Sequence, residues 1–224
     1  MTEADDNNKI FMLGVVHRDA EGPKLLLQWL ERIMPHIITL EFSHYGLTFR
    51  KQKGDEYKKR IREVLTRMKG NSRKYNAEAL ADLLSYVAVP YEYKIASQYI
   101  KKHGGLLYLT DLDVFSYLKL KHSEELFHPA NIEKLLCNGE GHANGNEKAM
   151  AKLFFEGGIK LTRYTEEMHI RDRYMRDKIS ILTRSRKDKR FLHICGWQHL
   201  EDPHNLYTSL NPEKAFIYDK TVRI

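Results

Sequence analysis

The chain of 224 residues is poor in cysteine and has no long hydrophobic run. Only Cys137 and Cys195 are present, so we expect no disulfide framework and predict a reducing, cytoplasmic location. No apolar stretch approaches the roughly 18 residues that a membrane-spanning helix needs. The first eight residues are acidic and polar, which is not typical of a signal or transit peptide. We therefore do not expect the chain to be inserted in a membrane.

Positive charge is concentrated in one segment. The whole chain has a net charge of +7, and residues 50–74 alone carry eleven Lys or Arg against three acids. Such a basic helix can bind an acidic partner, for example a nucleic acid or a membrane surface. A solvated surface helix explains the same composition, and aromatic residues that stack on bases are sparse here, at Tyr57 and Tyr75. No nucleic-acid-binding motif is visible.

Several apolar runs predict the buried strands of one sheet. Residues 9–16 and 37–42 flank a helical pattern, and this strand–helix–strand order is typical of parallel pairing with a right-handed crossover. Residues 106–109 and 190–196 predict two more buried strands, and residues 214–218 an edge strand. We therefore expect an α/β fold with a largely parallel sheet.

The length suits a single domain over residues 1–224, with or without a lid-like helical insertion. Residues 50–104 and 112–185 are predicted to be mostly helical segments that cover the sheet. Residues 139–146 are rich in turn-forming residues and are the predicted boundary of a hinge or lid. No tandem repeat of short period is found.

Two of the predicted strands lead into a Gly-x-x-His pattern. The first pattern runs from Gly14 to His17 and the second from Gly196 to His199, near opposite ends of the chain. Glu41 stands at the end of a third strand. Parallel strands present their carboxyl ends on one edge of a sheet, where such sheets bind ligands, so we expect the three side chains to face one pocket. Alternatively, each histidine is simply hydrogen-bonded at its own strand end.

Two histidines and a carboxylate with an open position form a recurring catalytic metal site. His17, Glu41 and His199 are therefore candidate ligands of a divalent ion such as Mn, Co or Zn. The ion would lower the pKa of a bound water toward neutrality. Alternatively, Glu41 is the general base. Glycine at positions 14 and 196 would let the backbone approach a ligand closely.

The order of these motifs resembles the TraB/TIKI family, also called TraB/GumN. Residues 10–50 contain FMLGVVHRD, an apolar helical pattern and PHIITLEFS, and look like that family's opening. Glu92 and Ala96 on a helix, Gly104, and the sequence LTD ending at Asp111 resemble its middle. The sequence RDRYM starting at position 171 resembles its Arg-rich helix before the last core strand. The resemblance extends over most of residues 9–200.

The resemblance implies a central sheet with helices on both faces and a metal-dependent hydrolase site. Carried over by position, His17, Glu41 and His199 form its core, with Arg173 and Asp111 beside them. Arg173 would stabilise an oxyanion or hold a substrate carboxylate. The wider superfamily includes erythromycin-esterase-like enzymes and ChaN-like haem-binding proteins.

Some candidate residues have a second interpretation. His44 closely follows Glu41 and would contact Glu41 without binding the metal itself, or it is simply exposed. Asp111 would orient a ligand, or cap the following helix. Arg173 would instead form a surface ion pair with Asp177.

The predicted function is a metal-dependent hydrolase that cleaves a peptide or ester bond in a peptide or small-molecule substrate. One alternative is a metal-free, esterase-like enzyme with a histidine as the base. The other is a non-catalytic protein that binds haem or an anionic ligand on the same fold.

Overall fold

The computed structural model describes residues 9–138, 144–157 and 164–219. The chain folds into two compact units, each assembled from separate stretches of sequence. The first comprises Met1–Phe42, Tyr91–Leu112 and Gly145–Ile224, and the second comprises Ser43–Pro90 and Asp113–Asn144. The helices expected in 50–104 and 112–185 are thus divided between the units, and the prediction of one domain over 1–224 stays a prediction.

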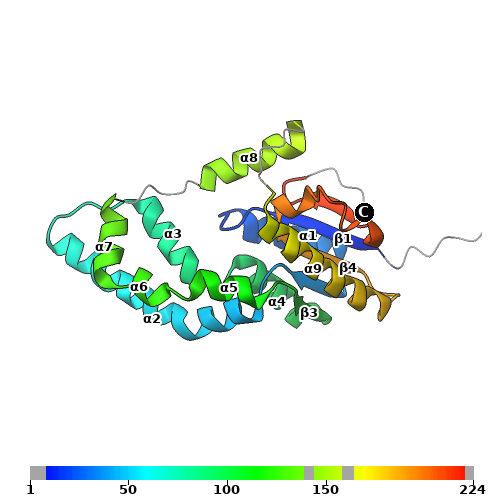
Figure 1. Cartoon of the computed structure of the whole chain (residues 1–224), viewed down its shortest axis with the longest axis horizontal. Coiled ribbons are helices and arrows are strands. Elements are labelled where there is room, and N and C mark those ends of the chain that lie inside the picture. Colours follow the sequence, from blue (N-terminus) through cyan, green and yellow to red (C-terminus); the bar gives the residue numbers. More distant parts are fainter. Residues whose placement is uncertain (1–8, 139–143, 158–163, 220–224) are drawn as a thin grey trace, which may run out of the picture. The chain divides into compact units, whose positions relative to one another are not determined.

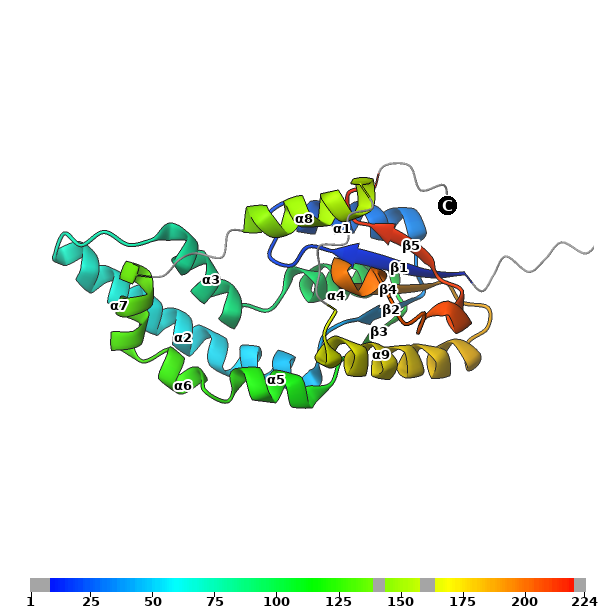
Figure 2. The same cartoon turned by 45° about the horizontal axis from the view of Figure 1, so that its top comes forward.

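Within the described residues, the first unit (Figure 1) contains a five-stranded parallel sheet. Its strands lie in the order β3-β2-β4-β1-β5, which can be followed in Figure 2. β4 pairs with both β1 and β2, so the last buried strand of the chain lies between the first two. The predicted α/β fold is confirmed. The strands are β1 (Ile10–Val15), β2 (Ile37–Leu40), β3 (Leu106–Leu109), β4 (Phe191–Gly196) and β5 (Glu213–Phe216).

Helices cover both faces of this sheet, and Figure 2 shows α1 (Gly22–Ile33) and α9 (Glu166–Arg184) on opposite sides of it. On one face, Ile179 of α9 packs against Met12 of β1 and Cys195 of β4. On the other face, α1 packs against α4 (Tyr91–His103), which also contacts β2 and β3. Each helix turns an apolar stripe toward the sheet, as amphipathic helices in α/β folds do.

The ends of α1 and α9 follow from local sequence. Pro23 lies in the first turn of α1, where its missing N–H costs no hydrogen bond, and Trp29 of that helix donates to the Ile217 carbonyl at 2.9 Å. The Thr165 hydroxyl caps α9 by accepting from the Met168 N–H at 3.2 Å. α8 (Asn144–Gly157) joins the first unit through Phe155, whose ring stacks on Phe216 with centroids 4.4 Å apart.

Two sequence predictions concern residues at the edge of what is described. Of the expected hinge at 139–146, residues 139–143 lie outside the described residues, and residues 144–146 begin α8. In the described part of the chain, no helix combines the length and the hydropathy needed to cross a bilayer.

The second unit is helical and has a core of its own. Residues 50–70 of the basic segment belong to α2, the longest helix among the described residues, whose buried face includes Tyr57, Ile61, Val64 and Met68. α2 packs against α3, α5 and α7, and Phe127 stacks on Tyr57. The helices of this unit are α2 (His44–Gly70), α3 (Ala77–Val87), α5 (Asp113–Leu120), α6 (Ser123–Leu126) and α7 (Pro129–Asn138).

Candidate active site

Glu41 and His199 meet where β2 and β4 end side by side. The Glu41 N–H continues the ladder by donating to the Ile194 carbonyl at 2.9 Å, and Glu41 Oε2 accepts the Gly196 N–H at 2.6 Å. His199 lies on the short helix η2 (Trp197–Leu200) that follows β4, and its Nε2 forms an ion pair with Glu41 Oε1 at 3.0 Å. Both side chains are buried, so water does not compete with their contact.

His17 approaches the same place from the end of β1, where its ring remains partly open to solvent. Its Nδ1 lies 2.7 Å from Glu92 Oε1, in the first turn of α4; the His17 side chain is 45% exposed and that of Glu92 only 9%. A Cβ added to Gly196 would lie 2.9 Å from His17 Nε2 and 3.4 Å from Glu41 Oε2. The structure therefore brings His17, Glu41 and His199 into one region.

The two glycines of the Gly-x-x-His patterns permit this close packing. At Gly14, an added Cβ would lie 2.5 Å from Leu200 Cδ1 and 2.9 Å from Trp197 Cα, so η2 can pack on β1 only because position 14 has no side chain. At Gly196, the added atom would meet the imidazole of His17. Both glycines therefore let neighbouring segments approach, rather than adopting a special backbone conformation.

Arg171, rather than Arg173, is the arginine that contacts Glu41. Arg171 Nη2 forms an ion pair with Glu41 Oε1, and its guanidinium holds Asp111 by two hydrogen bonds, Nε to Oδ1 at 2.9 Å and Nη2 to Oδ2 at 2.8 Å. Arg173 follows Arg171 by two residues, which in an α-helix is a rotation of about 200° around the axis. Arg173 therefore points away from the sheet and is exposed. The placement of Arg173 beside Glu41 is therefore corrected to Arg171.

Asp111 lies where the sequence predicts it, whereas His44 belongs to the other unit. Asp111 is buried behind Glu41, and the two carboxylates are bridged by Arg171. Its Oδ1 also accepts the Leu112 N–H at 2.8 Å, a local contact close to the capping role considered as its alternative. His44 is exposed in the first turn of α2, in the second unit, so its predicted support of Glu41 stays a prediction.

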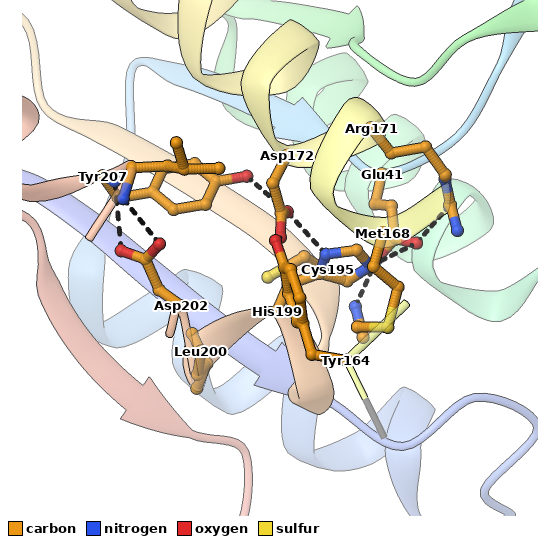
Figure 3. A network of polar contacts seen from close by, with 12 residues as sticks. Glu41, Tyr164, Met168, Arg171, Asp172, Cys195, His199, Leu200, Asp202 and Tyr207 are labelled. Carbon is orange, nitrogen blue, oxygen red and sulfur yellow. Dashed lines mark hydrogen bonds and ion pairs between the residues drawn. The ribbon is translucent and has the colours of Figure 1, made fainter. Parts of the chain in front are cut away.

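Asp172 forms the centre of a polar network that the sequence interpretation missed. Its Oδ1 accepts from His199 Nδ1 at 2.6 Å and from the Tyr207 hydroxyl at 2.9 Å, and its Oδ2 accepts from the Tyr164 hydroxyl (Figure 3). The carboxylate is fully buried. A signal was present, since Asp172 interrupts the apolar face of α9 that includes Met175, and a buried carboxylate needs partners.

The surroundings of Glu41 and His199 fix both as charged groups. Burial alone would raise the pKa of Glu41, but the positive charges of His199 and Arg171 hold that pKa well below its ordinary value. Burial alone would lower the pKa of His199. The charge of Glu41 and the hydrogen bond to Asp172 outweigh it and raise the pKa to about 10. At neutral pH, His199 is therefore an imidazolium that donates from both ring nitrogens.

His17 is also a stronger base than an isolated histidine. Partial enclosure lowers its pKa, but the hydrogen bond and charge of Glu92, together with the charge of Glu41, raise the pKa to about 9. Because Nδ1 is bonded to Glu92, the ring nitrogen that faces Gly196 is Nε2. Among the described residues, this nitrogen has no hydrogen-bond partner, which leaves it open to a ligand.

These residues do not fit a metal ion in this arrangement. No group of three or more His, Cys, Asp or Glu that could hold a metal occurs among the residues that the structure describes. His199 uses both nitrogens on carboxylates, and Glu41 already receives His199, Arg171 and the Gly196 N–H. A metal ligand needs a free lone pair on imidazole or carboxylate, and His199, which donates from both ring nitrogens, has none to offer.

Comparisons with protein-family models, curated proteins and solved structures find no match to this chain. The resemblance to the TraB/TIKI family therefore stays a prediction.

Proposed function

We propose that the chain is a hydrolase of ester or peptide bonds in which His17 is the general base. The observation that carries the proposal is the His17–Glu92 pair: a carboxylate holds Nδ1 while Nε2 stays open beside Gly196. A histidine oriented by a buried carboxylate is the arrangement that hydrolases use to take a proton from a nucleophile. The substrate is a peptide or a small molecule with a carbonyl group.

The proposed reaction uses residues of this chain alone. Glu92 accepts a hydrogen bond from the Nδ1–H of His17 and so fixes the neutral tautomer in which Nε2 has a lone pair. His17 Nε2 takes a proton from water, the water oxygen attacks the carbonyl carbon, and the leaving group then receives the proton from His17. Glu41 lies beside this imidazole as a carboxylate, and its negative charge adds to the basicity of His17.

The charged residues behind Glu41 have a positioning role in this proposal. Arg171 and His199 hold Glu41 from one side, and the Gly196 N–H holds its other oxygen. A carboxylate fixed by three donors cannot rotate, so its distance from His17 is set by the fold. This is the electrostatic preorganisation on which many hydrolytic sites depend.

The earlier alternatives make different predictions. A Mn-, Co- or Zn-dependent hydrolase would lose activity in a chelator, and a non-catalytic protein that binds haem or an anionic ligand would show no turnover at all. The acidic partner of residues 50–74 also stays a prediction, to be tested by the salt dependence of binding to an anionic polymer. We further propose a cytoplasmic location, supported by two cysteines that are both free, one exposed and one buried.

The experiment compares purified wild type with His17→Asn on a panel of chromogenic esters and fluorogenic peptides, in the presence of a chelator. Wild type should turn over at least one class, and His17→Asn should lose about 10²-fold or more in kcat/KM. His122→Asn, which changes an exposed histidine of the second unit, is the matched control. A His17→Asn variant as active as wild type would rule out His17 as the base.

A further inference from the structure

Two positively charged side chains converge on one oxygen of Glu41. His199 Nε2 lies 3.0 Å from Oε1, and Arg171 Nη2 contacts the same atom. All three side chains are largely buried. A carboxylate oxygen in such a place would otherwise need a cation or several hydrogen-bond donors, because burying an unpaired charge is costly.

The groups around this oxygen have no capacity left for another cation. Arg171 also donates hydrogen bonds to both oxygens of Asp111, and Nδ1 of His199 donates one to Asp172. Asp172 in turn accepts from two tyrosine hydroxyls. With His199 donating from both nitrogens, the cluster pairs two positive charges with three carboxylates, and each charge has a partner within hydrogen-bond distance.

We propose that Arg171 and His199 together occupy the place of a divalent metal ion at Glu41. They bring a charge of +2 to Oε1 of Glu41, a residue of the predicted His17, Glu41 and His199 metal site, and the guanidinium bridges the carboxylates of Glu41 and Asp111. The site thus has built-in cations in place of a metal. The proposal concerns cation binding and holds whether or not the chain is a hydrolase.

Removal of the guanidinium should convert the site into a metal site. In Arg171→Met, the carboxylates of Glu41 and Asp111 lose their shared counter-charge and can accept a divalent ion instead. Arg173→Met removes an exposed arginine from the same helix and is the matched control. After treatment with chelator and desalting, each protein is titrated with Mn²⁺, Co²⁺ and Zn²⁺ by calorimetry, and the metal bound after dialysis is measured.

We expect about one ion per chain in Arg171→Met, which also becomes more heat-stable when the ion is added, and none at Glu41 in wild type or Arg173→Met. An ion bound by wild type and lost in Glu41→Gln would overturn the proposal, whereas an ion retained in Glu41→Gln binds elsewhere and is consistent with it. A folded Arg171→Met that binds no ion would also overturn it.

If Arg171→Met does not fold, the comparison of wild type with Glu41→Gln decides the question. Arg171→Lys, which keeps one positive charge in this place, should then remain unable to bind the ions. Metal binding and turnover are measured separately, so a failure of this proposal is distinguishable from a failure of the proposed hydrolase.

Discussion

Raising the pH above neutrality should weaken the first unit, because His199 holds a proton in the folded state that the unfolded chain releases. Its pKa is about 10 in the fold and 6.5 in the unfolded reference. A raised pKa stabilises the fold fully below the unfolded value, and this stabilisation is lost as the pH rises toward the folded value. Between about pH 7 and about pH 8.3, His199 alone should lower the free energy of unfolding by about 2 kcal/mol.

The assay is urea unfolding followed by tryptophan fluorescence. The chain has two tryptophans, Trp29 and Trp197, and both are buried in the first unit, so the signal reports that unit alone. The pKa of His17 is also raised, to about 9, so wild type loses stability from that group over the same range, and the assay therefore compares wild type with a His199 variant. The pH range ends at about 8.3 because burial raises the pKa of the Cys195 thiol well above its ordinary value, and release of its proton on unfolding adds a further loss of stability at higher pH.

His199→Gln isolates the contribution of this one proton. Near pH 7 the variant should be less stable by about 3 kcal/mol or more, because it leaves two buried carboxylates short of a cation. The difference in stability between the variant and wild type should shrink by about 2 kcal/mol at the higher pH, where wild type has lost that part of its stabilisation. His122→Gln, at an exposed position, should follow wild type. A gap that stays constant over this range would refute the raised pKa of His199.

Three further predictions use different readouts. Since neutral His17 is the proposed base and its pKa is about 9, kcat/KM should rise about tenfold per pH unit from neutrality toward that value, and a flat profile would contradict this assignment. Gly196→Ala should cost about 10²-fold in kcat/KM by pushing the His17 ring aside, whereas Gly70→Ala, with open space around the added methyl, should leave activity unchanged. Phe127→Ala should destabilise the second unit by about 3–5 kcal/mol in circular dichroism melts, because the ring is fully buried and stacks on Tyr57; a cost below about 1 kcal/mol would show that the site collapses.

The strands and their polar ends were predictable from the sequence because they depend on local patterns. A continuous apolar run indicates a strand covered on both faces, and the strand–helix–strand order over residues 9–42 indicates parallel pairing. Parallel strands end on one edge, which is enough to bring the residues that follow β1, β2 and β4 to the same region. The geometric relation among His17, Glu41 and His199 therefore needed no knowledge of side-chain contacts.

The helical contributions were not predictable in the same way. Whether Arg171 or Arg173 reaches Glu41 depends on how α9 is rotated on the sheet, a matter of about 200° that the count of arginines does not reveal. The buried Asp172 would have indicated the rotation, since it shares a face with Met175 and Ile179. Glu92 lies 75 residues from His17 in the sequence, so only the packing of α4 brings the two together.

The second unit shows another limit of local patterns. Two separate stretches, 43–90 and 113–144, form one core. No change of composition along the chain marks the boundaries of these stretches. Within the basic segment, Arg60 pairs with Glu56 and Glu124, so part of its excess charge is paired inside the unit. Surface pairs of this kind contribute little to stability, but they lower the net charge that a polyanion would meet.

The position of β4 gives the two oxygens of Glu41 different surroundings. Because β4 lies next to β2, the Gly196 N–H takes Oε2 on the side that His17 approaches, while Oε1 faces His199 and Arg171. One carboxylate thus connects the cation pair to the proposed base. Arg171 and His199, which contact Oε1, keep Glu41 ionised by lowering its pKa. The negative charge of Glu41 in turn raises the pKa of His17, which lies on the side of Oε2. The basicity of His17 should therefore depend on contacts made by α9, although α9 provides no atom to the reaction.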